Sequence, residues 1–421
     1  MGLIVQKFGG SSVADAACIR RVASRVLETH QGGHQVVVIV SAMGDTTDDL
    51  IKLAHQITAT PSDREMDMLM STGEQVSVAI LAMALHAMGA DAVSLTGPQA
   101  GIFTDAMHRK AKIMGINPRR VWKHLKAGQI VIVAGFQGQT PEHDIATLGR
   151  GGSDTTAVAL AAALKADRCQ IFTDVEGVYS ADPRIVKKAC KLDEIAYDEM
   201  LELASLGAKV LVSRSVEFAK KYGVELEVLS SFSKVPGTIV KEEVKSMEDI
   251  VVRGVSADKD EVKITLAGVP DHPGVAAQLF KDLAGASINI DMIVQNISAQ
   301  GITDISFTVP EEDLAKTRRV MQTAAKGVGV QAVNVDADIA KVSIVGVGMR
   351  GHSGVAFQMF KTLAEQGINI LMISTSEIKI SVIVRKALAD KAMIALHKAF
   401  RLDKSRVARG KSAVKAKVRR K

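Results

Sequence analysis

Short apolar runs alternate with amphipathic stretches along the first 235 residues. The runs at 36–40, 92–95, 130–134, 170–173 and 226–229 have the length of strands, and most are rich in β-branched residues. Between them apolar residues recur at helical spacing. This alternation is typical of βαβ units, so it predicts an α/β domain with a mostly parallel sheet and helices on both faces.

The alternation ends near residue 235. The segment 233–240 contains a Pro-Gly pair, and residues 241–249 are highly charged before a different texture begins. We therefore expect a first domain over residues 1–240 and a linker over residues 241–259.

An internal repeat follows the linker, because Val262 and its neighbours match Val342 and its neighbours at a constant offset of 80. Gly274 falls on Gly354, and 288–290 fall on 368–370. Each copy reads as strand, Gly-opened helix and strand. The repeat predicts two ferredoxin-like α+β modules of β-α-β-β-α-β order, over residues 260–338 and 339–403.

Composition narrows the class of protein. A chain of 421 residues with 47% hydrophobic content suggests two or three domains. Its apolar runs, such as 78–85 and 157–164, are short for a membrane span, and no signal-peptide pattern precedes Lys7. Three cysteines without CxxC spacing indicate neither a disulfide framework nor a zinc site, so we expect no metal ligands and a soluble, cytoplasmic protein.

The net charge of +7 is concentrated at the C-terminus. Residues 401–421 have a balance of +9, which leaves −2 for the rest of the chain. We expect residues 404–421 to be a disordered basic tail, and RNA or an acidic partner stays an alternative for it. With one Trp and three Tyr, platforms for base stacking are not evident, so we do not expect nucleic acid as a partner.

Two glycine-rich turns carry the candidate chemistry: Lys7-Phe-Gly-Gly-Ser-Ser12 and Thr147-Leu-Gly-Arg-Gly-Gly-Ser-Asp-Thr-Thr156. Each follows an apolar strand and opens a helical pattern, so backbone N–H groups and the helix dipole converge on an anion. One such glycine pair would be no more than a tight turn. Two of them, with a lysine, an arginine and an aspartate attached, point to phosphoryl transfer.

No Walker motif is present, nor are the motifs of protein kinases. The two turns, together with Ser41-Ala-Met-Gly and the string from Phe172 to Arg184, resemble the amino-acid kinase superfamily and, within it, the aspartate kinases. The resemblance covers the chain except the basic tail. It implies transfer of the γ-phosphate of ATP to a side-chain carboxylate without a covalent enzyme intermediate.

The resemblance assigns Lys7 and Asp154 to catalysis. A carboxylate is already ionised at neutral pH, so the reaction needs neutralisation of negative charge more than it needs a base. Lys7, Gly9, Gly10 and Ser11 suit that role. Asp154 would orient the reacting carboxylate and its metal environment, and its alternative role is to cap a helix.

Substrate recognition needs a cation for the α-carboxylate and an anion for the α-ammonium. By resemblance Arg150 and Glu74 supply them, although Glu74 alone could be an ordinary first-turn helix acid. The other implied substrate residues are Ser41, Thr47, Gly151, Gly152 and Ser153. Ser41 and Thr47 would contribute hydroxyl donors, or would cap the next helix instead.

For the nucleotide, the resemblance implies Thr173, Asp174, Tyr179, Asp182, Arg184 and Lys209. Asp182-Pro183 is equally typical of a turn. Mg²⁺ would enter with ATP and bridge its phosphates.

The paired modules resemble ACT domains, which implies feedback control by an amino acid, here lysine, threonine or both. The implied effector residues of the first copy are Asp271, His272, Pro273, Gly274, Val275, Ala276, Asn289, Ile290, Asp291 and Gln295. Those of the second copy are Asn369, Ile370, Ser376 and Glu377. No acid stands at the place of Asp271 in the second copy, so we expect that copy to provide one wall of a shared pocket.

Aspartate kinases of this length resemble the class in which an internal translation start yields a separate regulatory subunit of the two ACT modules. Met247 is the candidate start. We also expect an oligomer formed through the ACT modules. Two alternatives stay open: a glutamate or N-acetylglutamate kinase, and a non-catalytic amino-acid sensor. Lys7, Arg150, Asp154 and Lys209 speak against the sensor.

Overall fold

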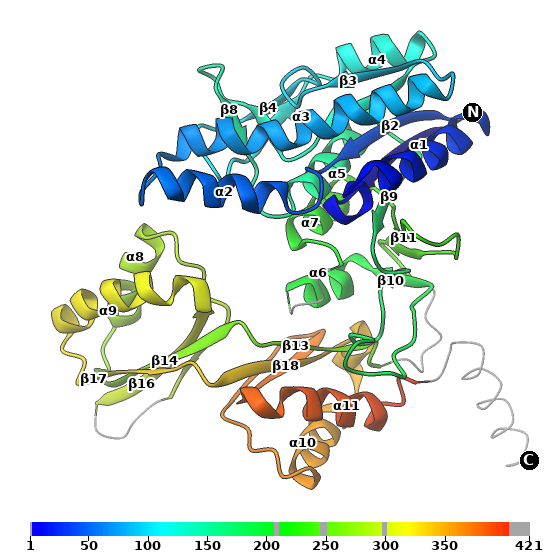
Figure 1. The fold of residues 1–421 in the computed structure, drawn as a ribbon. Helices are drawn as coiled ribbons and strands as arrows, with labels where there is room; N and C mark the ends of the chain where they lie inside the picture. Colours follow the sequence, from blue (N-terminus) through cyan, green and yellow to red (C-terminus); the bar gives the residue numbers. More distant parts are fainter. Residues whose placement is uncertain (1, 206–209, 245–250, 297–300, 353, 404–421) are drawn as a thin grey trace, which may run out of the picture. The chain divides into compact units, whose positions relative to one another are not determined.

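The computed structural model describes residues 2–205, 210–244, 251–296, 301–352 and 354–403 (Figure 1). The chain folds into two compact units. The first contains the chain up to Val178, Lys191–Ser205 and the segment that ends after strand β12. The second contains Tyr179–Cys190 and the chain from strand β13 onward.

An eight-stranded sheet forms the centre of the first unit, in the order β10-β12-β11-β9-β1-β2-β6-β3. Its strands are β1 (Leu3–Phe8), β2 (Gln35–Val40), β3 (Ala92–Leu95), β6 (Ile130–Ala134), β9 (Arg168–Thr173), β10 (Glu194–Ala196), β11 (Leu226–Ser230) and β12 (Thr238–Lys241). From β3 to β11 all neighbours are parallel, and β12 runs antiparallel to β11. The predicted mostly parallel sheet is confirmed.

Helices cover both faces of this sheet. α1 (Ala16–Gln31) and α3 (Asp63–Ala87) share one core with alternate residues of β2 and β6, among them Val38 and Ile132. α5 (Gly152–Leu164) contacts β1, β2 and β9, and α7 (Ser213–Tyr222) packs on α5. The unit also contains η1 (Gly10–Val13), α2 (Thr46–Ile57), α4 (Arg119–Lys126) and α6 (Tyr197–Ser205).

A second, four-stranded sheet in the first unit has no counterpart in the sequence prediction. Its order is β5-β4-β7-β8, with β4 (Ile102–Thr104), β5 (Ile113–Ile116), β7 (Gln137–Gln139) and β8 (Ile145–Thr147). These strands have only three or four residues each, too few to show a period-2 pattern. The last of them, β8, leads directly into the Gly149–Gly152 turn.

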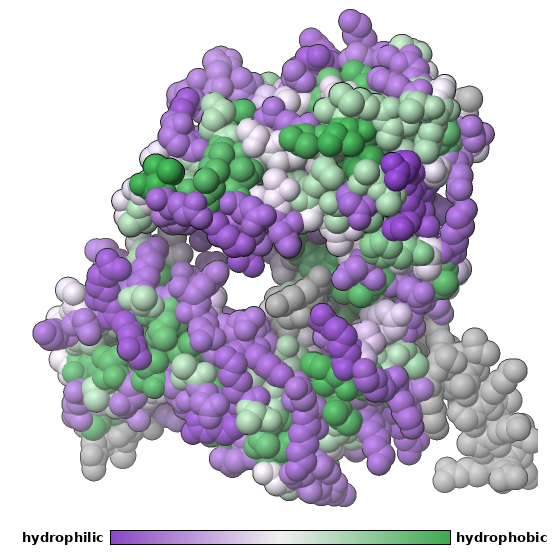
Figure 2. Space-filling view, viewed as in Figure 1, coloured by the Kyte–Doolittle hydropathy of each residue, from purple (hydrophilic) through white to green (hydrophobic). Residues whose placement is uncertain are grey.

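Helix α3 is long and apolar enough to cross a membrane by length and composition alone, although half of its most apolar window is buried in protein. The helix also buries two carboxylates, Asp67 and Glu74, against partners in the fold. Figure 2 shows apolar side chains among polar ones over α2 and α3, and those exposed on α3 include Met68, Val76 and Met83.

The second unit holds two sheets that reproduce the repeat. The first module comprises β14 (Glu261–Pro270), α8 (Val275–Gly285), β15 (Ile293–Gln295), β16 (Ile302–Pro310), η2 (Glu311–Asp313), α9 (Leu314–Val328) and β17 (Ala332–Asp336). Its antiparallel sheet has the order β15-β16-β14-β17, with α8 and α9 packed together. The predicted β-α-β-β-α-β order is confirmed for this copy.

The second module takes one strand from outside its expected range. It contains β18 (Ile339–Val345), η3 (Val347–Gly351), α10 (Val355–Glu365), β19 (Met372–Thr375), β20 (Lys379–Arg385), η4 (Lys386–Leu388) and α11 (Ala389–Ala399). The fourth strand of its sheet, in the order β13-β18-β20-β19, is β13 (Gly254–Asp258). Residues 254–258 were expected in the linker; instead they pair with the edge of β18, and Val255 enters the module core.

Tyr179–Cys190 packs on this same module. Ala181 and Val186 belong to its hydrophobic core, together with Leu396 of α11. The Val255 N–H donates to the Ser180 carbonyl at 2.8 Å, and Ser180 Oγ lies 2.9 Å from His397 Nε2 in a buried hydrogen bond. The segment therefore leaves the first unit after β9 and completes the core of the second module.

A buried lysine joins the two modules. Lys341 of β18 is 2% exposed, and its Nζ lies 2.6 Å from Asp291 Oδ2 and 3.2 Å from Glu261 Oε1. Asp258 Oδ2 is 4.0 Å away. Burial raises the pKa of Glu261, against the opposing effect of Lys341. One cation thus holds three carboxylates, two of which belong to the first module.

Candidate active site and effector cavity

The C-terminal ends of four parallel strands of the large sheet lie level with one another. Phe8 pairs with both Val40 and Phe172, and Val40 pairs with Ala134. The loops that follow are joined by backbone hydrogen bonds: Ser41 N donates to Phe8 O at 3.1 Å, and Gly44 N donates to Gly10 O at 3.1 Å. Ligands of parallel α/β sheets bind at this edge. The predicted residues 9–11, Ser41 and Thr47, and 173–174 lie at or just after the ends of three of these strands.

Lys7 and Asp154 meet beside this edge. Lys7 Nζ lies 2.6 Å from Asp154 Oδ1, and the two side chains are only 12% and 9% exposed. Lys7 belongs to β1 and Asp154 to the first turn of α5. Gly151 is the N-cap residue of α5, and no side chain caps that end. Asp154 thus binds Lys7 and does not act as the cap.

Glu74 is buried in the middle of α3, with 3% of the residue exposed. Its Oε1 accepts a hydrogen bond from the Ala42 N–H at 3.1 Å, which ties it to the loop that carries Ser41 and Thr47. Within the described part of the chain its Oε2 has no hydrogen-bond partner. Burial raises the pKa of this carboxyl to about 7. It is not a first-turn helix acid, because α3 begins eleven residues earlier, at Asp63.

Arg150 lies at the exposed tip of the turn between β8 and α5. Among the residues that the structure describes, its guanidinium forms no ion pair. Gly152 and Ser153 are buried below it, and Gly151 has a left-handed backbone with φ of 68°. As far as the described residues show, the turn therefore presents an unpaired guanidinium next to buried neighbours.

The predicted nucleotide residues are divided between the two units. Thr173 is the last residue of β9 and Asp174 follows it, and Thr173 Oγ1 donates to Asp174 Oδ1 at 3.0 Å. Tyr179, Asp182 and Arg184 lie in the segment that packs with the second unit. Arg184 Nη2 lies 2.8 Å from Asp182 Oδ2, and these hydrogen bonds lower the pKa of Asp182. Lys209 lies outside the described residues.

Some residues at this edge were not anticipated from the sequence. Ser12 Oγ and Ser231 Oγ are 2.6 Å apart and buried, which connects the first glycine turn to the end of β11. Phe8 and Phe172 stack with their ring centroids 4.5 Å apart. Asp67, which is fully buried, receives a hydrogen bond from Thr147 Oγ1 at 2.5 Å. Its spacing of seven residues from Glu74 was the one available signal, because it places both acids on the same helix face.

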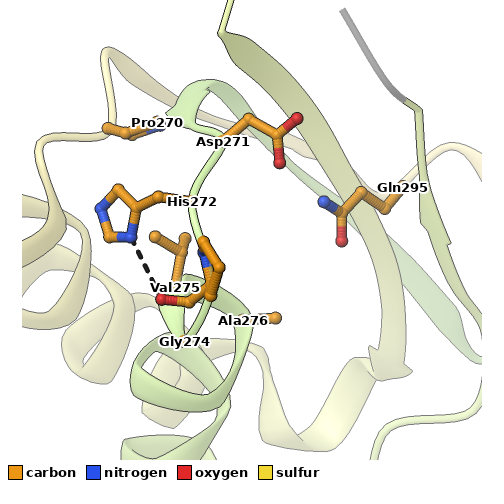
Figure 3. Close-up of a pocket in the computed structure, with 8 residues that line it drawn as sticks. Pro270, Asp271, His272, Gly274, Val275, Ala276 and Gln295 are labelled. Carbon is orange, nitrogen blue, oxygen red and sulfur yellow. Dashed lines mark hydrogen bonds between the residues drawn. The ribbon is translucent and has the colours of Figure 1, made fainter.

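A cavity of about 380 Å³ opens at the turn between β14 and α8. It is lined by Pro270, Asp271, His272, Pro273, Gly274, Val275, Ala276 and Gln295, seven of which were predicted. Figure 3 shows the Asp271 and Gln295 side chains pointing toward one another, while His272 turns to the other side and lies 3.3 Å from the Pro273 carbonyl. The cavity therefore pairs a carboxylate with an amide.

The other predicted effector residues do not line this cavity. Asn289 is exposed, Ile290 packs against the first module's core, and the Asp291 carboxylate binds Lys341. Asn369, Ile370, Ser376 and Glu377 belong to the second module, where Ser376 Oγ accepts from the Lys379 N–H at 3.2 Å. Their effector roles stay predictions. No group of three or more His, Cys, Asp or Glu in the described part of the chain is arranged to hold a metal ion.

The chain was compared with known proteins. The model of the amino acid kinase family matches residues 2–230, and that of the ACT domain matches residues 262–324 and 342–400. The aspartate kinase of Stutzerimonas stutzeri is 53% identical over 404 residues, which cover 96% of this chain and 98% of that protein.

Two solved structures of Escherichia coli aspartokinase III are also similar. The complex with aspartate and ADP has a TM-score of 0.83 at 26% identity, and covers 94% of this chain and 99% of that one. The complex with lysine and aspartate has a TM-score of 0.72 at 25% identity, with the same coverage. With catalytic and ACT regions both matched, this chain belongs to the amino acid kinase family and is one of its aspartate kinases.

Proposed function

We propose that this enzyme transfers the γ-phosphoryl group of ATP to the side-chain carboxylate of L-aspartate and forms 4-phospho-L-aspartate, the first step toward lysine, threonine and methionine. The observation that carries this proposal is the buried carboxylate of Glu74, which has one oxygen without a partner among the described residues. An amino-acid ammonium is the group that would satisfy it.

Burial of an ionised Glu74 carboxylate costs free energy, which either protonation of the carboxyl or a neighbouring cation offsets. Without a ligand, burial raises the pKa of this carboxyl to about 7, so a substantial fraction of it is protonated at neutral pH. A bound α-ammonium would supply both a hydrogen bond and a positive charge. N-acetylglutamate has no such ammonium, so the geometry favours a free amino acid over that substrate.

Lys7 and Asp154 supply the electrostatics of phosphoryl transfer in this proposal. The transition state spreads negative charge over the oxygens of the transferred group, and a preorganised cation stabilises it. Asp154 holds Lys7 at the end of β1 within a largely buried pair. The attacking carboxylate of aspartate needs no base, because it is ionised at neutral pH. Arg150 is the proposed partner of the α-carboxylate, with Ser41, Thr47 and Ser153 as hydroxyl donors.

ATP is the proposed phosphoryl donor, and a relative of similar fold has been solved with ADP. The uncapped start of α5 and the ammonium of Lys7 suit an anion. Thr173 and Asp174 are the proposed nucleotide contacts of the first unit, and Tyr179, Asp182, Arg184 and Lys209 stay predicted ones. Mg²⁺ would be held by the phosphate oxygens of ATP.

The cavity at Asp271 is the proposed effector site, with lysine or threonine as the effector. Its volume suits a small amino acid. Asp271 would bind the ammonium, and the backbone N–H groups that open α8 would meet the carboxylate. Support comes from the relative that was solved with lysine and aspartate.

Assembly through the ACT modules belongs to the same proposal. The sheet of each module has a short strand at one edge, β15 in the first module and β19 in the second. These edge strands expose Ile293 and Ile373. Open strand edges with apolar side chains favour pairing with another chain. A shorter subunit initiated at Met247, which lies outside the described residues, and a cytoplasmic location stay predictions.

The test is product formation with ATP and Mg²⁺, with the acyl phosphate trapped as a hydroxamate. L-aspartate, L-glutamate and N-acetylglutamate are compared, each with and without lysine and threonine. We expect product with aspartate alone and suppression by at least one effector. Equal activity with glutamate would contradict the substrate assignment, and activity that neither effector changes would contradict the regulatory one.

A further inference from the structure

Asp67 binds both the 105–111 loop and the end of β8, the strand that leads into the Arg150 turn. It is fully buried on α3, and its carboxylate accepts hydrogen bonds from Thr147 Oγ1 at 2.5 Å and from the Arg109 N–H at 3.0 Å. His108 Nδ1 lies 2.8 Å from Asp67 Oδ2. The guanidinium of Arg109 points elsewhere, to Asp63 at 3.2 Å. A buried carboxylate held by so many donors is costly to maintain, and an apolar residue would fill this place more cheaply if packing were its only role.

The donors of Asp67 come from two segments, the end of β8 and the 105–111 loop, which contact one another at the start of the Arg150 turn. Thr147 is the last residue of β8, three residues before Arg150. The Ala111 N–H donates to the Thr147 carbonyl at 2.9 Å. Gly149 packs so closely on the 105–111 loop that a β-carbon at that residue would lie 3.0 Å from the Arg109 carbonyl oxygen. Asp67 thus locks the 105–111 loop against the start of the turn.

Arg214 of α7 binds the same two segments. Its Nη1 donates to the Leu148 carbonyl at 2.9 Å, and its Nη2 donates to the Ala111 carbonyl at 2.8 Å. Burial lowers the pKa of this guanidinium. This half-buried arginine therefore donates to two backbone carbonyls, one in each of the two segments that Asp67 also binds.

We infer that Asp67, supported by Arg214, is a positioning residue that fixes the Thr147–Gly151 turn and thereby places the Arg150 guanidinium for the α-carboxylate of aspartate. The inference rests on the proposed role of Arg150. α3 then serves the substrate twice from one face: Glu74 binds it directly, and Asp67, two turns earlier, sets the residue that binds its other end.

The test compares KM values for aspartate and ATP in Asp67→Asn, Thr147→Val and Thr147→Ser. Asparagine and valine remove the charge-assisted bond, so we expect the KM for aspartate to rise roughly tenfold or more while that for ATP changes less than about twofold. Thr147→Ser keeps the hydroxyl and should restore the KM. Asp63→Asn is the matched control, because it is an exposed acid of the same helix that binds the Arg109 side chain and not the turn.

Arg150→Ala separates this inference from the function on which it rests. If the aspartate KM is unchanged in Arg150→Ala, the assignment of Arg150 itself is wrong. If Arg150→Ala raises the KM, Asp67→Asn added to it should raise it no further, because Asp67 acts through Arg150. The inference would be overturned if Asp67→Asn and Thr147→Val lowered thermal stability or kcat but left the KM for aspartate unchanged. It would also be overturned if their effects on this KM added to that of Arg150→Ala. Thr147→Val decides the matter if Asp67→Asn does not fold.

Discussion

At the scale of single residues, the charge of Glu74 depends on what is bound beside it. In the free protein this carboxyl has a pKa of about 7, because it is buried. An ammonium ligand favours the ionised form, so binding of substrate and loss of a proton from Glu74 are linked.

Aspartate should therefore bind less well as the pH falls through 7. We expect kcat/KM for aspartate to decline toward tenfold per pH unit below about pH 7 as Glu74 takes up a proton, and to be lower and nearly independent of this ionisation in Glu74→Gln. Glu65→Gln, an exposed acid of the same helix, is the control. A decline of equal steepness in Glu74→Gln would show that another group is responsible.

The same residue predicts a stability change in the absence of ligand. The pKa of Glu74 is higher in the folded state than its ordinary value of 4.5, so the folded state binds this proton more tightly. Its contribution to the free energy of unfolding is thus fully present below about pH 4.5 and is lost as the pH rises through 7. At pH 8, Glu74→Gln should be more stable than the unaltered protein by on the order of 2 kcal/mol, and the difference should shrink at pH 5. Urea unfolding at the two pH values measures both free energies.

Sequence patterns single out residues such as Lys7, Asp154 and Glu74 because their proposed roles depend on motif strings. They do not reveal Asp67 or Arg214, whose hydrogen-bond partners lie more than 40 residues away in the sequence. Asp291 shows the converse: its string suggests a ligand contact, whereas its carboxylate binds Lys341, a residue of the other module. Partners distant in sequence are set by tertiary packing, which local patterns do not encode.

At the scale of elements, the long β-branched strands were predictable and the short ones were not. The runs at β2 and β6 are buried on both faces, as in a parallel sheet. β8 has three residues, and its pairing with β7 depends on the turn between them. β13 escaped prediction because its partner, β18, is separated from it by the whole first module.

The turn before α5 gives a prediction at this scale. Gly151 has φ of 68°, and a β-carbon there would collide with the Val212 side chain; Gly33 has φ of 87° with open space around it. Gly33→Ala should lose about 1 kcal/mol of stability from its backbone conformation alone. Gly151→Ala should lose clearly more and should raise the KM for aspartate, because the turn must shift. Equal losses in the free energy of unfolding, measured with urea, would mean that the Val212 side chain moves aside without destabilising the protein.

At the scale of the whole molecule, regulation requires that the effector cavity and the active site be coupled although they lie in different units. Asp271→Ala should weaken inhibition by lysine or threonine and shift the inhibition curve to higher effector concentration. His352→Ala, in the corresponding turn of the second module, should leave the curve in place. Superimposable curves for Asp271→Ala and the unaltered enzyme would remove the proposed cavity from regulation.

The Lys341 cluster gives the last prediction, because it fixes the two modules to one another. Lys341→Met leaves Glu261 and Asp291 without their buried cation, which should cost about 3–5 kcal/mol. Adding Glu261→Gln and Asp291→Asn should recover most of that loss. Lys361→Met, in an exposed pair with Glu365, is the control. Thermal unfolding is the measurement, and a triple variant no more stable than Lys341→Met would mean that the lost charge was not the cause.

The strand β13 makes the first module an insertion within the second. Asp258 pairs with Lys341, so the chain leaves the sheet of the second module and returns to it at adjacent positions. A fragment cut between the modules, or one that begins after Asp258, would lack β13 and leave that edge of β18 unpaired. A shorter translation product contains the complete sheets of both modules only if it starts before Gly254. Met247 satisfies that condition. Such a product would still lack Ala181 and Val186, so its second module would begin with part of its core missing.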